Sequence, residues 1–183
     1  VWRQEAYTLG KRDYILLDAV SSFGTGLQET TRFMAQFVET LRGKFNNCLD
    51  VGTGAGILAL VALKGGAAEV CAIDLDEMCV KAASANFKAN GYLDDNIFNA
   101  DLRVFKPGRP FDFVCANLVT HGLVKMKRKI VFLVEPGGWL AVSGISLENL
   151  PFLRRGFEDL PLRCVKIQKG IKWAAVLFRK DKA

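Results

Sequence analysis

Short apolar runs alternate along the chain with segments in which apolar residues recur every three or four positions. The runs predict buried strands at 47–51, 69–74, 97–101, 111–116 and 139–144. The helical spacing predicts helices at 30–41, 57–64, 76–90 and 121–134. Strands that alternate with helices in this way are typical of an α/β fold with a mostly parallel sheet covered by helices on both faces.

The two ends of the chain depart from this alternation. Near the C-terminus, the apolar stretches 163–167 and 173–178 flank Gly170 and predict an antiparallel hairpin. Residues 1–20 lack a clear period, although 14–17 have the composition of an edge strand, and we interpret them as an N-terminal arm. With 183 residues, half of them hydrophobic, the chain suits a single domain, to which we assign residues 21–183.

A turn with three glycines at alternate positions joins the strand at 47–51 to the helix that follows it. Gly52, Gly54 and Gly56 come directly after the acidic residue Asp50 and Val51. Glycines at this spacing let the backbone turn sharply and let a ligand lie against bare main chain, so the turn predicts a nucleoside site. A dinucleotide fingerprint would need a glycine where this chain has Ile57, and the lysine of a phosphate-binding loop is missing as well.

Asp74 supports a nucleoside ligand. It ends the strand 69–74 and follows Gly52 by 22 residues, close to the offset of roughly 20 residues at which a carboxylate accepts hydrogen bonds from both ribose hydroxyls. The alternative is that Asp74 only caps the helix that begins near Asp76.

Three motifs together resemble a known family. The turn from Asp50 to Ala59 is similar to motif I of the Rossmann-like S-adenosylmethionine methyltransferases. Combined with Phe23-Gly24-Thr25-Gly26-x-Gln28-Glu29-Thr30-Thr31 and with Cys115-Ala116-Asn117-Leu118, it resembles the PrmA family of ribosomal-protein methyltransferases over about residues 20–180. That family trimethylates a large-subunit ribosomal protein on lysines and on its N-terminal amine. It usually has histidine in place of Gln28, and it has a separate N-terminal substrate-recognition domain.

The resemblance implies a fold, a cofactor and a set of site residues. The fold is a Rossmann-like class I methyltransferase, whose seven-stranded, mostly parallel sheet has helices on both faces and an antiparallel C-terminal hairpin. The cofactor is S-adenosylmethionine. The residues implied or predicted to bind it are Thr31, Asp50, Gly52, Gly54, Asp74, Asp101 and Asn117. For Asp101, contact with the adenine amino group and an ordinary loop position remain equal alternatives.

Asn117 is the predicted catalytic residue. It follows the apolar strand 111–116, at the edge of the sheet where open α/β folds bind ligands. Its side-chain amide has one acceptor and two donors, so it can hold the cofactor and also accept a hydrogen bond from an incoming amine. The alternative is that Asn117 only satisfies loop amides.

Charge and cysteine content refine the expected partners. The net charge of +6 favours an acidic partner such as a ribonucleoprotein. The basic face at 125–129 is either solvated or contacts RNA or an acidic protein. The five cysteines form no C-x-x-C pair, and we interpret them as reduced thiols without a metal role. With no apolar run of about 18 residues and no leader pattern, we expect a soluble, cytoplasmic protein without a membrane partner.

The predicted reaction is N-methylation of lysine or amino groups of a protein, with a ribosomal protein as the expected partner. Enzymes that methylate nucleic-acid amino groups often carry Asn-Pro-Pro-aromatic at this position, whereas this chain has Asn117-Leu118-Val119-Thr120. That difference argues against base methylation. An RNA or small-molecule methyltransferase, or a cofactor-binding module without catalysis, remains an alternative.

Overall fold

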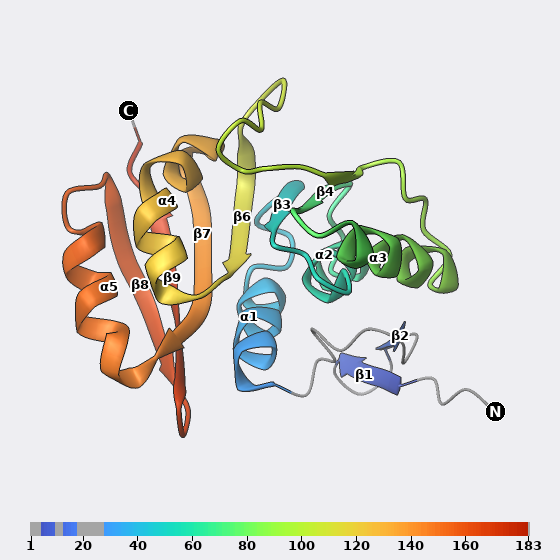
Figure 1. Cartoon of the computed structure of the whole chain (residues 1–183), viewed down its shortest axis with the longest axis horizontal. Helices are drawn as coiled ribbons and strands as arrows, with labels where there is room; N and C mark the ends of the chain where they lie inside the picture. The colour runs from blue at the N-terminus through green and yellow to red at the C-terminus, as the bar shows by residue number, and fades with distance from the viewer. Residues whose placement is uncertain (1–4, 10–12, 18–27, 183) are drawn as a thin grey trace.

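The computed structural model describes residues 5–9, 13–17 and 28–182. Its centre is a seven-stranded sheet in the order β5-β4-β3-β6-β7-β9-β8 (Figure 1). The strands are β3 (Asn47–Val51), β4 (Glu69–Asp74), β5 (Ile97–Asn99), β6 (Phe111–Asn117), β7 (Val134–Ser146), β8 (Leu162–Lys169) and β9 (Trp173–Lys180). Neighbouring strands from β5 to β7 pair in parallel, and β9 is antiparallel to both β7 and β8.

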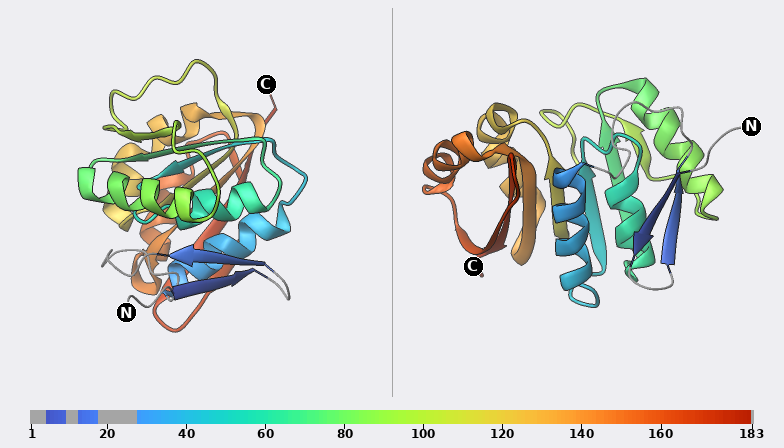
Figure 2. Two further views of the ribbon diagram at one scale, coloured as in Figure 1. Left: turned by 90° about the vertical axis from the view of Figure 1, so that its right-hand side faces the viewer. Right: turned by 90° about the horizontal axis from the view of Figure 1, so that it is seen from below.

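Helices cover both faces of the sheet (Figure 2). They are α1 (Glu29–Thr40), α2 (Ile57–Lys64), α3 (Glu77–Ala89), α4 (Thr120–Leu133), the short 3₁₀ helix η1 (Leu147–Asn149) and α5 (Leu150–Phe157). Apolar side chains of α1, α2 and α3 fill one core, and those of α4 and α5 fill the other. Because side chains alternate along a strand, Phe113 and Cys115 of β6 face the first core while Val114 and Ala116 face the second. The predicted fold class is confirmed.

The arm at the N-terminus contains a separate hairpin. Strand β2 (Asp13–Leu17) pairs antiparallel with β1 (Glu5–Leu9) in a two-stranded sheet, so residues 14–17 do form a strand but do not extend the main sheet. Asn90, at the end of α3, fixes this hairpin, because its side chain accepts a hydrogen bond from the Leu16 N–H and donates one to the Leu16 carbonyl. Ile15 and Leu17 are buried in the core beneath α2 and α3.

Two local details differ from the sequence pattern, which predicts Met78 on the buried side of its helix and a turn at 135–138. Met78 in the first turn of α3 is 68% exposed rather than inward. Residues 135–138 lie within β7 instead of forming a turn before it, with an irregular register opposite Phe111–Phe113. On the basic face of α4, Lys127 contacts the Gly156 carbonyl and the Asp159 carboxylate.

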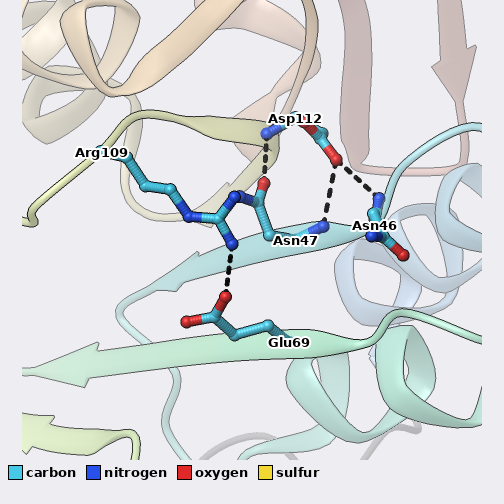
Figure 3. A network of polar contacts seen from close by, with 5 residues as sticks. All are labelled: Asn46, Asn47, Glu69, Arg109 and Asp112. Carbon is cyan, nitrogen blue, oxygen red and sulfur yellow. Dashed lines mark hydrogen bonds and ion pairs between the residues drawn. The ribbon is translucent and has the colours of Figure 1, made fainter.

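A polar network fixes the amino ends of β3, β4 and β6 (Figure 3). The Asp112 carboxylate accepts hydrogen bonds from the N–H groups of Asn46 and Asn47, at 2.7 and 3.1 Å. In return, the Asn47 side chain accepts one from the Asp112 N–H at 2.6 Å. Arg109 forms an ion pair with Glu69 at 2.6 Å. These contacts set the strand register at the edge opposite the candidate site.

Candidate functional site

The strand order reverses direction at β3. After β3 the chain forms β4 and β5 on one side, and it then returns to place β6 on the other side of β3. In open α/β sheets, ligands bind at the carboxyl ends of the strands on either side of such a reversal. The predicted residues Gly52, Asp74 and Asn117 lie at or next to the carboxyl ends of β3, β4 and β6.

The glycine turn is fastened to β4. Gly52, Gly54 and Gly56 have φ values of 70°, 54° and 81°, in the left-handed region that favours glycine. The N–H groups of Gly52 and Thr53 donate to the Ile73 carbonyl at 2.9 and 3.0 Å. The Gly54 N–H donates to the Asp74 carboxylate at 2.9 Å, so Asp74 and the turn form one unit.

Asp50 stabilises the glycine turn through buried hydrogen bonds. Its side chain is buried, with 1% of the residue exposed, and it accepts hydrogen bonds from the Thr53 hydroxyl at 2.7 Å and the Cys115 thiol at 3.4 Å. Burial raises the pKa of Asp50 to about 6, although these two hydrogen bonds act in the opposite direction. The carboxylate therefore links β3, the turn and β6.

A pocket of about 280 Å³ opens beside the turn, and Gly52, Asp74 and Asp101 contribute to its lining. Its remaining walls are mainly apolar; they include Val51, Ile73, Leu75, Leu102, Leu118 and Met126. Apolar walls with two carboxylates suit a nucleoside, because the base can lie against the apolar side chains while hydroxyl and amino groups donate to the acids. Asp74 also accepts a hydrogen bond from the Asp76 N–H at 3.0 Å, as a residue that helps to cap α3 would.

Asp101 is held in place by Arg103. Its carboxylate accepts hydrogen bonds from the Arg103 N–H and Nε, both at 2.8 Å. The guanidinium hydrogen bonds are the main reason that the pKa of Asp101 is lowered, so the carboxylate remains an ionised acceptor at neutral pH.

Asn117 ends β6 opposite Ser143 of β7. Leu118, the next residue, donates its N–H to the Ser143 carbonyl at 3.2 Å. A bulge in β7 follows at Gly144, whose φ is 82° and where a Cβ atom would overlap the Leu118 carbonyl oxygen. The bulge therefore supports the loop that carries Asn117 and Leu118.

Four of the predicted site residues do not line this pocket. Thr31 is buried in the first turn of α1, and Thr31, Asp50, Gly54 and Asn117 are not among the described residues that line the pocket. Their roles in binding or catalysis stay predictions. Residues 23–27 of the loop motif lie outside the described part of the chain.

Sequence reasoning missed the apolar walls and the bulge. Leu102 and Met126 belong to no motif, and Leu118 ends a motif without being predicted to contact the ligand. Leu102 and Leu118 do come directly after Asp101 and Asn117, which the sequence did single out. The isolated Gly144 at the end of a predicted strand was an available signal, since a single glycine in a strand often marks a bulge.

Across residues 5–9, 13–17 and 28–182, no helix combines the length and apolar character needed to cross a membrane. In the same residues, no group of three or more histidine, cysteine or acidic side chains could hold a metal ion. Cys48, Cys71 and Cys115 are buried free thiols, in agreement with their predicted positions in buried strands.

The sheet order, the glycine turn and the antiparallel C-terminal hairpin define the fold of the class I S-adenosylmethionine-dependent methyltransferases. The N-methyltransferase NodS from Bradyrhizobium japonicum WM9, solved with S-adenosyl-L-homocysteine, has this fold, with a TM-score of 0.69 over 88% of this chain and 92% of that one, at 14% identity.

The chain belongs to the PrmA family, whose model, "Ribosomal protein L11 methyltransferase (PrmA)", matches residues 1–181. The ribosomal protein L11 methyltransferase of Geobacter sulfurreducens is 37% identical over 91% of this chain and 54% of that protein. The crystal structure of ribosomal protein L11 methylase from Lactobacillus delbrueckii subsp. bulgaricus gives a TM-score of 0.86 at 26% identity, over 97% of this chain and 91% of that one. The chain spans 54–60% of the length of the curated relatives it matches.

Proposed function

We propose that this chain uses S-adenosylmethionine to methylate lysine or amino groups of a ribosomal protein. The observation that carries the proposal is the unit formed by the glycine turn and Asp74, which borders an apolar pocket at the strand reversal. Membership of the PrmA family supports the reaction and the class of acceptor. A ribosomal acceptor also favours action in the cytoplasm and proximity to RNA.

Each part of the cofactor has candidate partners in this chain. The partly exposed main chain at Gly52 and Gly54 is suited to the methionine end, and the Asp74 carboxylate to the ribose hydroxyls. Leu102 and Leu118 provide apolar surface for the base, with Asp101 available to its amino group. The bound cofactor supplies an activated sulfonium methyl group, so the protein has mainly to align the acceptor and exclude water.

The acceptor amine must lose its proton before it attacks. A lysine has a reference pKa of ~10.4 and is mostly protonated at neutral pH, but an apolar environment favours the neutral amine. Asn117 can accept a hydrogen bond from that amine through its side-chain oxygen and so direct the nitrogen lone pair. No further acid or base is assigned, because correct alignment alone can lower the barrier by ~7–11 kcal/mol.

The test is methyl transfer from labelled S-adenosylmethionine to purified ribosomal protein L11, with ribosomal RNA and fractionated lysate in parallel reactions. Label in the protein supports the proposal. Label confined to RNA would favour a nucleic-acid methyltransferase. Binding of S-adenosylhomocysteine without transfer to any fraction would favour a cofactor-binding module without catalysis.

A further inference from the structure

Glu29, the first residue of α1, contacts the tip of the β8–β9 hairpin. Its two carboxylate oxygens accept hydrogen bonds from the N–H groups of Ile171 at 2.9 Å and Lys172 at 3.3 Å. These backbone hydrogen bonds lower the pKa of Glu29, so the carboxylate is ionised at neutral pH. The contact joins segments that are 142 residues apart in the sequence.

The hairpin tip is shaped to receive this carboxylate. Gly170 closes a tight turn by donating its N–H to the Trp173 carbonyl at 2.8 Å. A Cβ atom at Gly170 would lie only 2.5 Å from a Glu29 carboxylate oxygen, so a larger residue would displace one of the two. On the other side, the Lys172 carbonyl accepts a hydrogen bond from the Leu147 N–H at 3.0 Å. The tip is thus held between α1 and η1.

The tip stands beyond the strand end that carries Asn117. Asn117 is opposite Ser143 of β7, whereas Trp173 is opposite Ser146, three residues further along. This span contains the bulge at Gly144, which adds one residue to β7, so at a rise of ~3.3 Å per residue the tip begins roughly 7 Å beyond Asn117 along the strand direction. Figure 1 shows the hairpin extending past the end of β6 on the side where α1 begins.

Two large apolar residues on this tip are left in solvent. Ile171 is 85% exposed and Trp173 is 38% exposed. Both lie at the carboxyl edge of the sheet, from which an acceptor has to approach the cofactor.

We propose that Glu29 is a positioning residue that holds the β8–β9 tip so that Ile171 and Trp173 form one wall of the entrance for the protein segment bearing the accepting amine. This inference rests on the proposed function.

The first test compares Glu29→Ala and Glu29→Gln with the unchanged chain, using ribosomal protein L11 as acceptor. For Glu29→Ala, we expect KM for the acceptor to rise about tenfold, with the Kd for S-adenosylhomocysteine changed less than about twofold, because only the acceptor wall moves. Glu29→Gln keeps one acceptor oxygen and should recover part of the loss. Amide hydrogen exchange at Ile171 and Lys172 should accelerate in Glu29→Ala.

A matched control breaks another contact between the same elements, away from the tip. The Gln168 side chain of β8 donates to the Gln36 side chain, which lies about two helical turns along α1 from Glu29. We expect Gln36→Ala to leave KM for the acceptor unchanged. An equal rise in KM for both variants would show that general loosening of α1 against the hairpin, rather than the Glu29 contact, is responsible.

A double-mutant cycle tests whether Glu29 acts through the tip. The combined variant Ile171→Ala and Trp173→Ala should also raise KM for the acceptor, and adding Glu29→Ala should raise it by less than the product of the separate effects. Independent effects, or a Glu29→Ala change in S-adenosylhomocysteine affinity as large as the change in KM, would overturn the inference. The unchanged chain is measured first. If it binds S-adenosylhomocysteine but methylates no L11, the proposed function fails, and this result is separate from any effect of Glu29.

Discussion

Asp50 and Asp74 lie on neighbouring strands and contact the same glycine turn, but their surroundings differ. Asp74 is partly exposed, lines the pocket and accepts a hydrogen bond from Gly54. Asp50 is buried and bonds to Thr53 and Cys115 inside the protein. Their different burial favours different roles for the two acids: Asp74 borders the pocket and is the predicted ligand contact, whereas Asp50 supports the turn.

The role of Asp74 is tested by its replacement with alanine. We expect Asp74→Ala to weaken S-adenosylmethionine binding by roughly 1.5–3 kcal/mol, because charge-assisted hydrogen bonds to the ribose would be lost. Calorimetric titration measures the change. Asp76→Ala is the control, since Asp76 caps α3 through the Met78 N–H but does not line the pocket. An unchanged Kd in Asp74→Ala would leave Asp74 with the capping role alone.

Asp50 should produce a measurable pH dependence of stability. Its pKa is about 6 in the folded protein and 3.8 in the absence of burial, so the folded state binds the proton more tightly. Protonated Asp50 therefore favours the folded state, and this stabilisation is fully present below about pH 4. As the pH rises through 6 it is lost, which lowers the free energy of unfolding by about 3 kcal/mol. Urea unfolding of the unchanged chain and of Asp50→Asn at about pH 4 and pH 7 isolates this contribution, because the other titrating groups cancel in the comparison. The free energy of unfolding of Asp50→Asn relative to the unchanged chain should rise with pH; a constant difference would contradict the assigned shift.

Asn117 should matter more for turnover than for folding. If its side chain directs the incoming amine, Asn117→Ala should reduce single-turnover methyl transfer by about a hundredfold, because misplacement near the reacting centre is that costly. The melting temperature, measured beside it, should change little. Transfer at the normal rate would remove Asn117 from the catalytic role, and a matching loss of stability would assign it to the support of the loop.

At the scale of whole elements, segments with strong local signals were predictable. The turn between β3 and α2 follows from its glycines, and α3 begins at the N-cap Asp76 and is followed by Gly91 with a φ of 79°, as the sequence indicates. Helix α5 was missed because it is short, although Leu150, Leu153 and Phe157 have helical spacing. The order of the main sheet depends on contacts between distant segments, which local patterns do not encode. The pairing of β1 with β2 is local, but residues 1–20 have no clear period from which to predict it.

The bulge in β7 gives a prediction at this scale. Gly144→Ala adds a Cβ atom that overlaps the Leu118 carbonyl, in addition to the strain of a positive φ. We expect a loss of roughly 1–3 kcal/mol in the free energy of unfolding and weaker S-adenosylhomocysteine binding, because Leu118 lines the pocket. Gly91→Ala is the matched control, since Gly91 has a similar φ of 79° but open space around it. If both variants bound S-adenosylhomocysteine with the same Kd, the bulge would not influence the pocket and the prediction would be wrong.

For the molecule as a whole, the sequence indicated the edge of the sheet but not the complete site. The ends of separate strands could be expected to meet there, and Gly52, Asp74 and Asp101 do contribute to one pocket. Its apolar walls come from several loops and from α4, which the motifs do not link. The acceptor side was even harder to predict from the sequence, because the Glu29 contact forms only when α1 and the β8–β9 hairpin pack together in the folded protein.

Binding of the cofactor product should raise the melting temperature of the whole chain. A ligand that binds only the folded state stabilises it by mass action, by ~2.7 kcal/mol at a hundred times its Kd. For a domain of this size, that corresponds to a rise of roughly 5–10 °C in the melting temperature. We expect this rise with S-adenosylhomocysteine and none with NADPH, because Ile57 replaces the third glycine that a dinucleotide fingerprint requires. Asp74→Ala should reduce the S-adenosylhomocysteine shift. Stabilisation by NADPH alone would overturn the assignment of the pocket to a methyltransferase cofactor.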